Sequence, residues 1–294
     1  MTSRASLQAV LASRLGSADE ARWMIEEVLG AGARTRTGTG PEAEQVLFEM
    51  AARRLGGEPL QYVLGSWAFR SIELAVDPRA LIPRPETEQV VEVALGEVRR
   101  RLLPAGSFGG PLRVADLGTG SGAIALSVAV ELGSECPGLQ VAATDVDPSA
   151  LELAAANLRR VAADHPYVEE QVELRAGGWF DALAPAWHGL VGLVVSNPPY
   201  VSEPEWPSLD PQVRREPYGA LVAPAGSDGT PGFAGVEAVV KGARDWLAPG
   251  GAVVVEMAPH HAQPARAAAK KAGYREVRVE ADLAGRPRAL VARR

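Results

Sequence analysis

The feature that most constrains the fold of this 294-residue chain is an alternation of short apolar runs with helix-periodic stretches, which continues from residue 112 to the C-terminus. Expected strands lie at 112–116, 140–145, 172–175, 190–196, 252–257, 276–280 and 289–292. Helical periodicity fills the intervals at 123–132, 148–158, 236–247 and 262–272. This alternation is typical of strands joined by crossover helices. The sequence therefore predicts an α/β fold whose parallel sheet is covered on both faces.

The first third of the chain has a different pattern. Residues 1–57 read as short helices, in which Ser17 and Glu20 fit a capping box and Pro41 suits a first helical turn. Strand-like alternation follows over 62–76, and the prolines in 82–85 indicate a stiff connector. We therefore expect a helical domain at 1–75, a connector at 76–110 that ends in a glycine-rich linker (104–111), and the main domain at 111–294.

A glycine-rich loop joins the first expected strand of the main domain to its helix. Residues 116–123 read Asp-Leu-Gly-Thr-Gly-Ser-Gly-Ala, and their glycines let the backbone turn sharply and approach a ligand. Asp145 ends the second strand, where an acid can hold a ribose. The loop also satisfies the dinucleotide pattern G-x-G-x-x-G/A, so a nicotinamide cofactor stays open. Asp116 before the first glycine and the additional Gly122 favour S-adenosylmethionine instead.

Trp179 follows the third expected strand, where its ring has two interpretations. It can stack on an adenine, or it can be an ordinary core side chain, and the sequence does not separate the two.

The second candidate feature is the tetrapeptide Asn197-Pro198-Pro199-Tyr200, which follows the fourth expected strand directly. That position lies at the carboxyl edge of the sheet, where open α/β proteins bind ligands. An amide or exocyclic amino nitrogen is a poor nucleophile because its lone pair is delocalised. The Asn197 side-chain oxygen and the Pro198 carbonyl can each accept one of its hydrogens, and Tyr200 offers a flat face. The pattern predicts methyl transfer to a planar nitrogen, and the competing interpretation is a simple turn.

Charge and composition narrow the partners. Thirty basic and 36 acidic residues give a net charge of −6, and no basic stripe suggests a nucleic-acid surface. Cys136 is the single cysteine and the four histidines are scattered, so no metal site is expected. The sequence also has no run of about 18 apolar residues that would cross a membrane. We therefore expect a cytoplasmic enzyme without a metal.

Taken together, these motifs make the sequence similar to the HemK/PrmC family of protein-(glutamine-N5) methyltransferases, from Glu58 to the C-terminus. The segments that carry the resemblance are Glu58 to Gly65, Leu81 to Glu88, Asp116 to Gly122, Asn197 to Tyr200, Glu216-Pro217 with Ala220-Leu221, and Asp282 to Gly285 with Arg288. The tetrapeptide alone does not decide the substrate, because amino-methylating DNA enzymes resemble it there too.

The resemblance implies a Rossmann-like class I S-adenosylmethionine-dependent methyltransferase domain with a small N-terminal helical domain. It implies that one set of residues binds the cofactor: Asp116, Gly118, Thr119, Gly120, Ser121, Gly122, Asp145, Trp179 and Asn197. The implied catalytic residues are Asn197, Pro198, Pro199 and Tyr200. The implied substrate is the glutamine of the Gly-Gly-Gln motif in class-1 peptide-chain release factors, which act in translation termination. The helical domain is then expected to grip the release factor.

Two residues depart from the family pattern, and two other functions remain open. Gly178 stands where relatives usually have an acid, and Ala258 stands where they have a glycine. An adenine-N6 or cytosine-N4 nucleic-acid methyltransferase suits the same planar nitrogen, although the net charge opposes it. A non-catalytic homologue that binds release factors is the other alternative, and the intact tetrapeptide argues against it.

Overall fold

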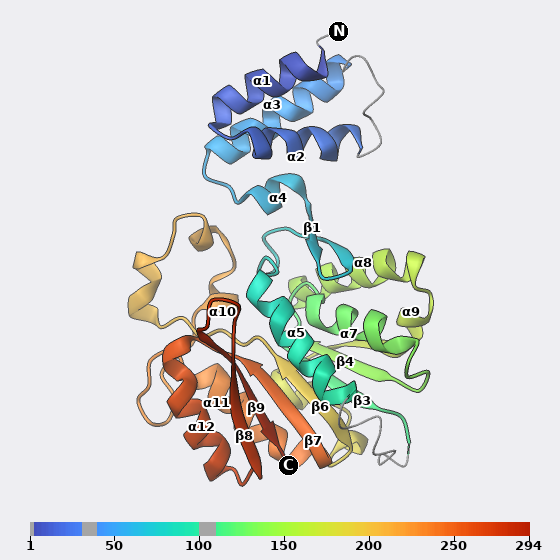
Figure 1. Ribbon diagram of the computed structural model, residues 1–294, viewed down its shortest axis with the longest axis vertical. Helices are drawn as coiled ribbons and strands as arrows, with labels where there is room; N and C mark the ends of the chain where they lie inside the picture. Colours follow the sequence, from blue (N-terminus) through green and yellow to red (C-terminus); the bar gives the residue numbers. More distant parts are fainter. Residues whose placement is uncertain (1–2, 31–39, 100–109) are drawn as a thin grey trace.

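The computed structural model describes residues 3–30, 40–99 and 110–294, and it shows a small helical unit joined to a larger α/β unit (Figure 1). The helical unit consists of α1 (Arg4–Leu15), α2 (Ala18–Leu29) and α3 (Pro41–Leu55). These helices bury an apolar stripe against one another, with Leu11, Met24 and Leu47 fully enclosed. The unit therefore has a hydrophobic core of its own.

Only part of the expected capping box at the start of α2 is present in the described residues. The Ser17 hydroxyl accepts a hydrogen bond from the Glu20 backbone N–H at 3.2 Å, as the sequence predicts. The Glu20 carboxylate binds Arg54 of α3 instead of turning back to the cap, with N···O distances of 2.8 and 2.9 Å. This half-buried ion pair ties α2 to α3.

The segment between the two units forms a short helix and a hairpin. α4 (Leu60–Leu64) ends at Gly65, whose φ of 79° is left-handed, and β1 (Ser66–Phe69) then pairs antiparallel with β2 (Ile72–Ala75). The strand expected over 62–76 was therefore wrong at its start. Tyr62 and its neighbours have apolar alternation, but their side chains are buried by one helical turn. Most of the expected glycine-rich linker, at 104–109, lies outside the described residues.

Seven strands form the main sheet. They are β3 (Arg113–Leu117), β4 (Gln140–Asp145), β5 (Val172–Ala176), β6 (Val191–Ser196), β7 (Leu247–Glu256), β8 (Glu276–Ala281) and β9 (Pro287–Arg293). Their order is β5-β4-β3-β6-β7-β9-β8. The first five strands are parallel, whereas β9 runs antiparallel to both β7 and β8. The expected parallel sheet is thus mixed at one edge, because β8 and β9 are joined by a tight turn rather than a crossover helix.

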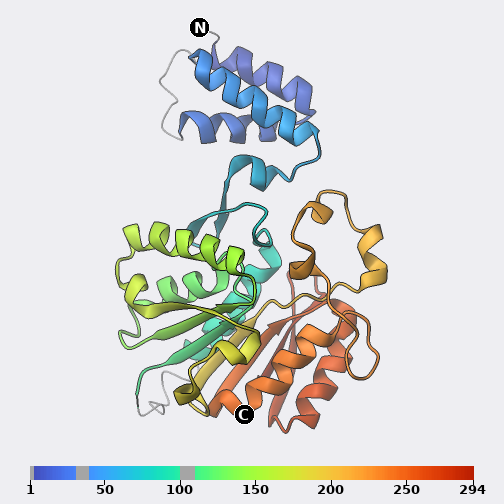
Figure 2. The same cartoon turned by 180° about the vertical axis from the view of Figure 1, so that it is seen from behind.

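Helices cover both faces of the sheet (Figures 1 and 2). One face carries α5 (Pro85–Glu97), α7 (Ala123–Gly133), α8 (Pro148–Asp164) and α9 (Tyr167–Gln171). The other face carries α11 (Ala234–Trp246) and α12 (Ala262–Lys271). Val114 and Ala115 of β3 enter opposite cores, as alternation along a strand requires. The Rossmann-like α/β fold that the sequence predicts is confirmed, and α5, from within the expected connector, packs on the sheet.

A long excursion leaves the carboxyl edge of the sheet between β6 and α11 and rises toward the helical unit (Figure 2). It contains the short helices η5 (Glu203–Ser208), η6 (Val213–Arg215) and α10 (Tyr218–Leu221). Arg215 donates a hydrogen bond from this excursion to the Gly56 carbonyl at 2.8 Å. Three further short turns are η3 (Trp179–Ala182), η4 (Pro185–Trp187) and η7 (Pro259–His261). Over the described ranges, every helix is too short or too polar to span a membrane.

Candidate active site

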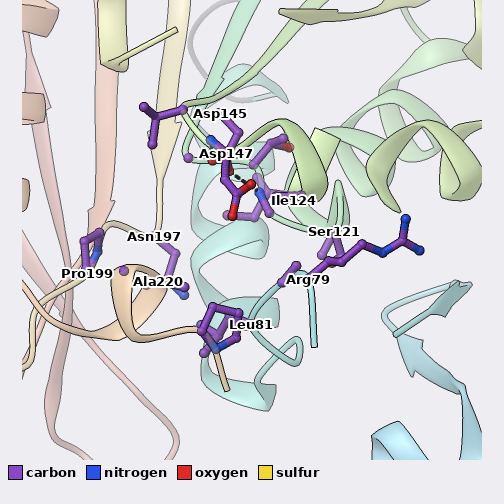
Figure 3. Close-up of a pocket in the computed structure, with 18 of the residues that line it drawn as sticks. Arg79, Leu81, Ser121, Ile124, Asp145, Asp147, Asn197, Pro199 and Ala220 are labelled. Carbon is purple, nitrogen blue, oxygen red and sulfur yellow. Dashed lines mark hydrogen bonds between the residues drawn. The ribbon is translucent and has the colours of Figure 1, made fainter. Parts of the chain in front are cut away.

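A cavity of about 690 Å³ opens at the carboxyl ends of the central strands. The chain passes from β3 to β4 on one side and later returns to β6 on the other, so the strand order reverses at β3. A ligand crevice is expected at such a reversal. Asp145 and Asp147 lie on one wall of the cavity and Asn197 and Pro199 on another (Figure 3).

The glycine loop between β3 and α7 forms part of the cavity wall. Gly118, Gly120 and Gly122 have φ values of 74°, 55° and 85°, which residues with a Cβ rarely adopt. A Cβ on Gly118 would touch the Trp179 ring at 3.7 Å, and one on Gly122 would crowd Leu126 at 3.1 Å. Glycine therefore lets the backbone adopt this left-handed loop at the cavity wall.

Asp116 lies beneath this loop and supports it from below. Its Oδ2 accepts hydrogen bonds from the Thr119 hydroxyl at 2.7 Å and from the Ala125 backbone N–H at 3.1 Å. The side chain is fully buried, and this burial raises the pKa of the carboxyl to about 7. Asp116 is not one of the residues that line the cavity. Its geometry therefore favours shaping the loop over touching a ligand.

Asp145 lies opposite the loop, at the end of β4, and does line the cavity. Its Oδ2 accepts from the Gly120 backbone N–H at 2.9 Å and its Oδ1 from the Asp147 N–H at 3.0 Å. Each carboxylate oxygen has further lone pairs, so Asp145 can still accept hydrogen bonds from a pair of hydroxyls. These bonds fix both the carboxylate and the tip of the glycine loop.

Trp179 closes the same end of the cavity. Its backbone has a φ of 45°, and its ring packs on Gly118. Gly178 also lines the cavity, and a Cβ added there would meet no atom within 4 Å. The cavity thus has open space at the position where the resemblance leads us to expect an acidic side chain. Ala258 has ordinary extended backbone (φ −64°, ψ 148°), so alanine is unstrained where the resemblance leads us to expect glycine.

The tetrapeptide directly follows β6, which Ser196 ties to β3 through a 2.6 Å hydrogen bond to the Leu117 carbonyl. Asn197 donates from Nδ2 to the Thr87 hydroxyl at 3.2 Å. Tyr200 donates from its hydroxyl to Oε1 of Glu256 at 3.3 Å, and burial of that hydroxyl raises the pKa of Tyr200. The loop is thus held from two neighbouring elements.

The site residues expected from the sequence fall into two groups. Eight of them line the cavity together: Gly118, Thr119, Gly120, Ser121, Asp145, Trp179, Asn197 and Pro199. Four others are not among the residues that line it: Asp116, Gly122, Pro198 and Tyr200. The structure therefore brings the glycine loop, the strand-end acid and the Asn197 amide to one cavity. No cluster of three or more potential metal ligands occurs among the described residues.

Sequence reasoning assigned no role to several residues that build this site. Glu216, from the excursion, accepts from the Ile82 N–H at 2.9 Å and forms a buried ion pair with Arg84. Thr87 lines the cavity, and Glu256 lies fully buried behind it. The sequence does contain one signal that could identify such residues, namely an isolated acid within an apolar run, such as Glu256 at the end of β7. A buried carboxylate needs hydrogen-bond partners, and strand-end position places them near the cavity.

Comparisons with known proteins find similar methyltransferases. The family model described as "Methyltransferase small domain" matches residues 106–207. The "Release factor glutamine methyltransferase" of Bordetella pertussis is 41% identical over 271 residues, which cover 90% of this chain and 91% of the relative. The protein of the same name from Deinococcus radiodurans is 36% identical, covering 94% of this chain and 90% of the relative. Among solved structures, a methyltransferase from Pyrococcus furiosus has a TM-score of 0.49 at 18% identity, covering 83% of this chain and 98% of that chain.

Proposed function

The chain belongs to the release factor glutamine methyltransferase family, and from this membership we propose the reaction that its cavity performs. It transfers a methyl group from S-adenosylmethionine to the side-chain amide nitrogen of a release-factor glutamine. The glutamine is that of the Gly-Gly-Gln motif in class-1 release factors. The observation that carries the proposal is the placement of Asn197 in one cavity with the glycine loop and Asp145.

The cavity fits the proposed cofactor. The loop at 118–122 has no side chains at the positions where a Cβ would meet Trp179 or Leu126, so its backbone can approach a ligand closely. Asp145 retains lone pairs for the two ribose hydroxyls, with charge-assisted bonds of roughly 1.5–3 kcal/mol each. Trp179 offers a ring face for the adenine. When bound, S-adenosylmethionine supplies an electrophilic methyl group, and its product is S-adenosylhomocysteine.

Asn197 and Pro198 make the glutamine amide reactive by accepting its two hydrogens. The Asn197 side-chain oxygen accepts one amide hydrogen, and the Pro198 carbonyl accepts the other. Positive charge develops on the amide nitrogen as it attacks and is lost when one of its two hydrogens leaves to water as a proton, so these oxygens stabilise the transition state more than the ground state. The two prolines restrict the loop, so the acceptors keep their positions without reorganisation. Pro199 adds an apolar wall to the cavity.

The glutamine reaches this point between two segments that line the cavity, residues 79–84 and residues 217–220. The buried pair of Arg84 and Glu216 holds the two segments together. A substrate loop rich in glycine suits a passage of this kind, because glycine has no side chain to be excluded. We propose that the N-terminal helical unit binds the body of the release factor.

Replacing Asn197 with Ala tests the proposal. We expect kcat for methylation of a release factor to fall on the order of 10²-fold, by analogy with losing one positioned transition-state partner. The Kd for S-adenosylmethionine, measured by calorimetry, is expected to rise much less than kcat falls, because Asn197 is one of nine implied cofactor contacts. Asp145→Asn is the matched control, since it weakens cofactor binding and leaves the Asn197 amide in place. Near-normal turnover by Asn197→Ala with intact cofactor binding contradicts the assigned role.

A further inference from the structure

A chain of three hydrogen-bonded side chains runs from the interior of the sheet to the cavity. Glu256, at the end of β7, accepts from the Thr87 hydroxyl at 2.7 Å through Oε2. The Thr87 oxygen in turn accepts from Nδ2 of Asn197 at 3.2 Å. The three residues come from β7, from the first turn of α5 and from the loop after β6. Thr87 and Glu256 are 169 positions apart along the sequence, and Thr87 and Asn197 are 110 apart. The three side chains nevertheless meet at one amide.

The hydrogens available on each group determine which group donates and which accepts in these two hydrogen bonds. A threonine hydroxyl has one hydrogen, and at Thr87 the ionised carboxylate of Glu256 takes it, because an ionised carboxylate can only accept. Toward Asn197 the Thr87 oxygen therefore presents lone pairs. These lone pairs attract Nδ2 and repel Oδ1. The Asn197 amide is thus fixed with its nitrogen toward Thr87 and its oxygen on the other side, and no described residue donates to that oxygen.

The same carboxylate also holds the far end of the tetrapeptide. Its second oxygen, Oε1, accepts from the Tyr200 hydroxyl at 3.3 Å. Glu256 is 1% exposed, and this burial raises the pKa of its carboxyl to about 7, while Thr87 and Arg288 of β9 favour the ionised form. Removing this carboxylate from water is costly unless its oxygens are satisfied, so its partners are held firmly. One buried group therefore orients both Asn197 and Tyr200.

We propose that Thr87 and Glu256 are positioning residues that fix the Asn197 carboxamide with its oxygen toward the substrate nitrogen. The proposal deepens the proposed function and rests on it for the identity of that nitrogen. It differs from a purely structural role because Thr87 itself lines the cavity. A residue that only stabilises the fold would affect melting temperature without selecting one amide orientation.

Thr87→Val tests the proposal with little change in shape, because it exchanges the hydroxyl for a methyl group. We expect kcat to fall about five- to tenfold, the loss of one bond that orients a reacting group, while the Kd for S-adenosylmethionine stays near wild type. Thr87→Ser keeps the hydroxyl and is expected to restore most of kcat. Tyr274→Phe is the matched control, since it removes a buried hydroxyl bond to the Val240 carbonyl away from the cavity. It is expected to lower the melting temperature and leave kcat unchanged.

A second measurement on the full chain does not depend on turnover. With ¹⁵N-labelled asparagine, the Asn197 side-chain NH₂ signal is identified by its loss in Asn197→Ala. We expect slow exchange of this NH₂ with water in the wild type and in Thr87→Ser, and faster exchange in Thr87→Val. Equal exchange in the wild type and Thr87→Val, or wild-type kcat in a folded Thr87→Val, overturns the positioning role. A wild-type protein that exchanges slowly but transfers no methyl group to release factors supports the orientation and overturns the proposed function.

Discussion

Glu256 is the residue whose protonation has the clearest consequence for turnover. Burial raises the pKa of its carboxyl to about 7, so it is partly protonated near neutral pH. The ionised form accepts from both Thr87 and Tyr200, whereas the protonated form carries a hydrogen on one oxygen and loses an acceptor. The other groups that act on its charge are Arg288 of β9, which favours ionisation, and Glu86 of α5, which opposes it.

We therefore predict that kcat rises with pH through about 7 and falls below it, since the ionised carboxylate is the productive form. The glutamine amide and the reacting methyl sulfonium group do not titrate in this range, so at saturating substrates we assign the pH dependence of kcat to the enzyme. The pH profile of kcat at saturating substrates measures this rise, and Glu256→Gln is expected to make kcat independent of pH in this range. The same rise in Glu256→Gln would assign it to another group, such as Asp116, whose pKa burial also raises to about 7.

At this scale the sequence predicted the residues that face the cavity better than those that hold them. Asn197 and Asp145 were found because each follows a recognisable strand, and strand ends meet at one edge. Thr87 and Glu256 were missed because their roles depend on contacts across more than 100 positions. Asp116 shows another limit of the sequence, since motif position alone does not distinguish an acid that lines the cavity from one that does not.

At the scale of elements, the turn before α11 is the structure that fixes the tetrapeptide from behind. Gly232 has a φ of 68°, and a Cβ there would lie 3.0 Å from the Ser202 nitrogen and closer still to the Tyr200 carbonyl oxygen. Gly235 packs against the two prolines, where a Cβ would lie 2.9 Å from the Pro199 carbonyl oxygen. The absence of side chains at these glycines lets the tetrapeptide loop pack closely against the start of α11.

Gly232→Ala is therefore predicted to lower kcat at least tenfold or so, by moving Tyr200 and the loop that carries Asn197. Gly273→Ala is the matched control, because Gly273 has a φ of 84° but no atom within 4 Å of an added Cβ. In both variants the alanine must adopt left-handed backbone, which lowers the free energy of unfolding by about 1–2 kcal/mol. Denaturant unfolding and steady-state kinetics separate the two effects. Equal kcat in the two variants would remove the loop-displacement explanation.

The sequence predicted most of the central elements because strand and helix periods differ sharply there. Expected and observed bounds agree closely for β4, whose apolar run is flanked by clear turn residues. Predictions failed where the same residue pattern is compatible with two different structures. Apolar alternation at Tyr62 was satisfied by α4, and the direction of β9 depends on which strand it joins, which its own residues do not encode.

At the scale of the whole molecule, the cavity lies where three parts of the chain meet. The sheet supplies the strand ends, the segment 79–87 supplies one wall, and the excursion after β6 supplies the opposite one. The excursion also reaches the helical unit through Arg215 and Gly56. The net charge of −6 adds no overall attraction to a polyanion, in keeping with the protein substrate that we propose.

The most direct test of the central claim is the position of the transferred methyl group. Purified protein is incubated with labelled S-adenosylmethionine and a class-1 release factor, and the products are mapped by tandem mass spectrometry. We predict one added methyl group on the side-chain nitrogen of the Gly-Gly-Gln glutamine, greatly reduced with Asn197→Ala. A methyl group on nucleic acid or on another release-factor residue, or none with a folded enzyme that binds the cofactor, would contradict the account.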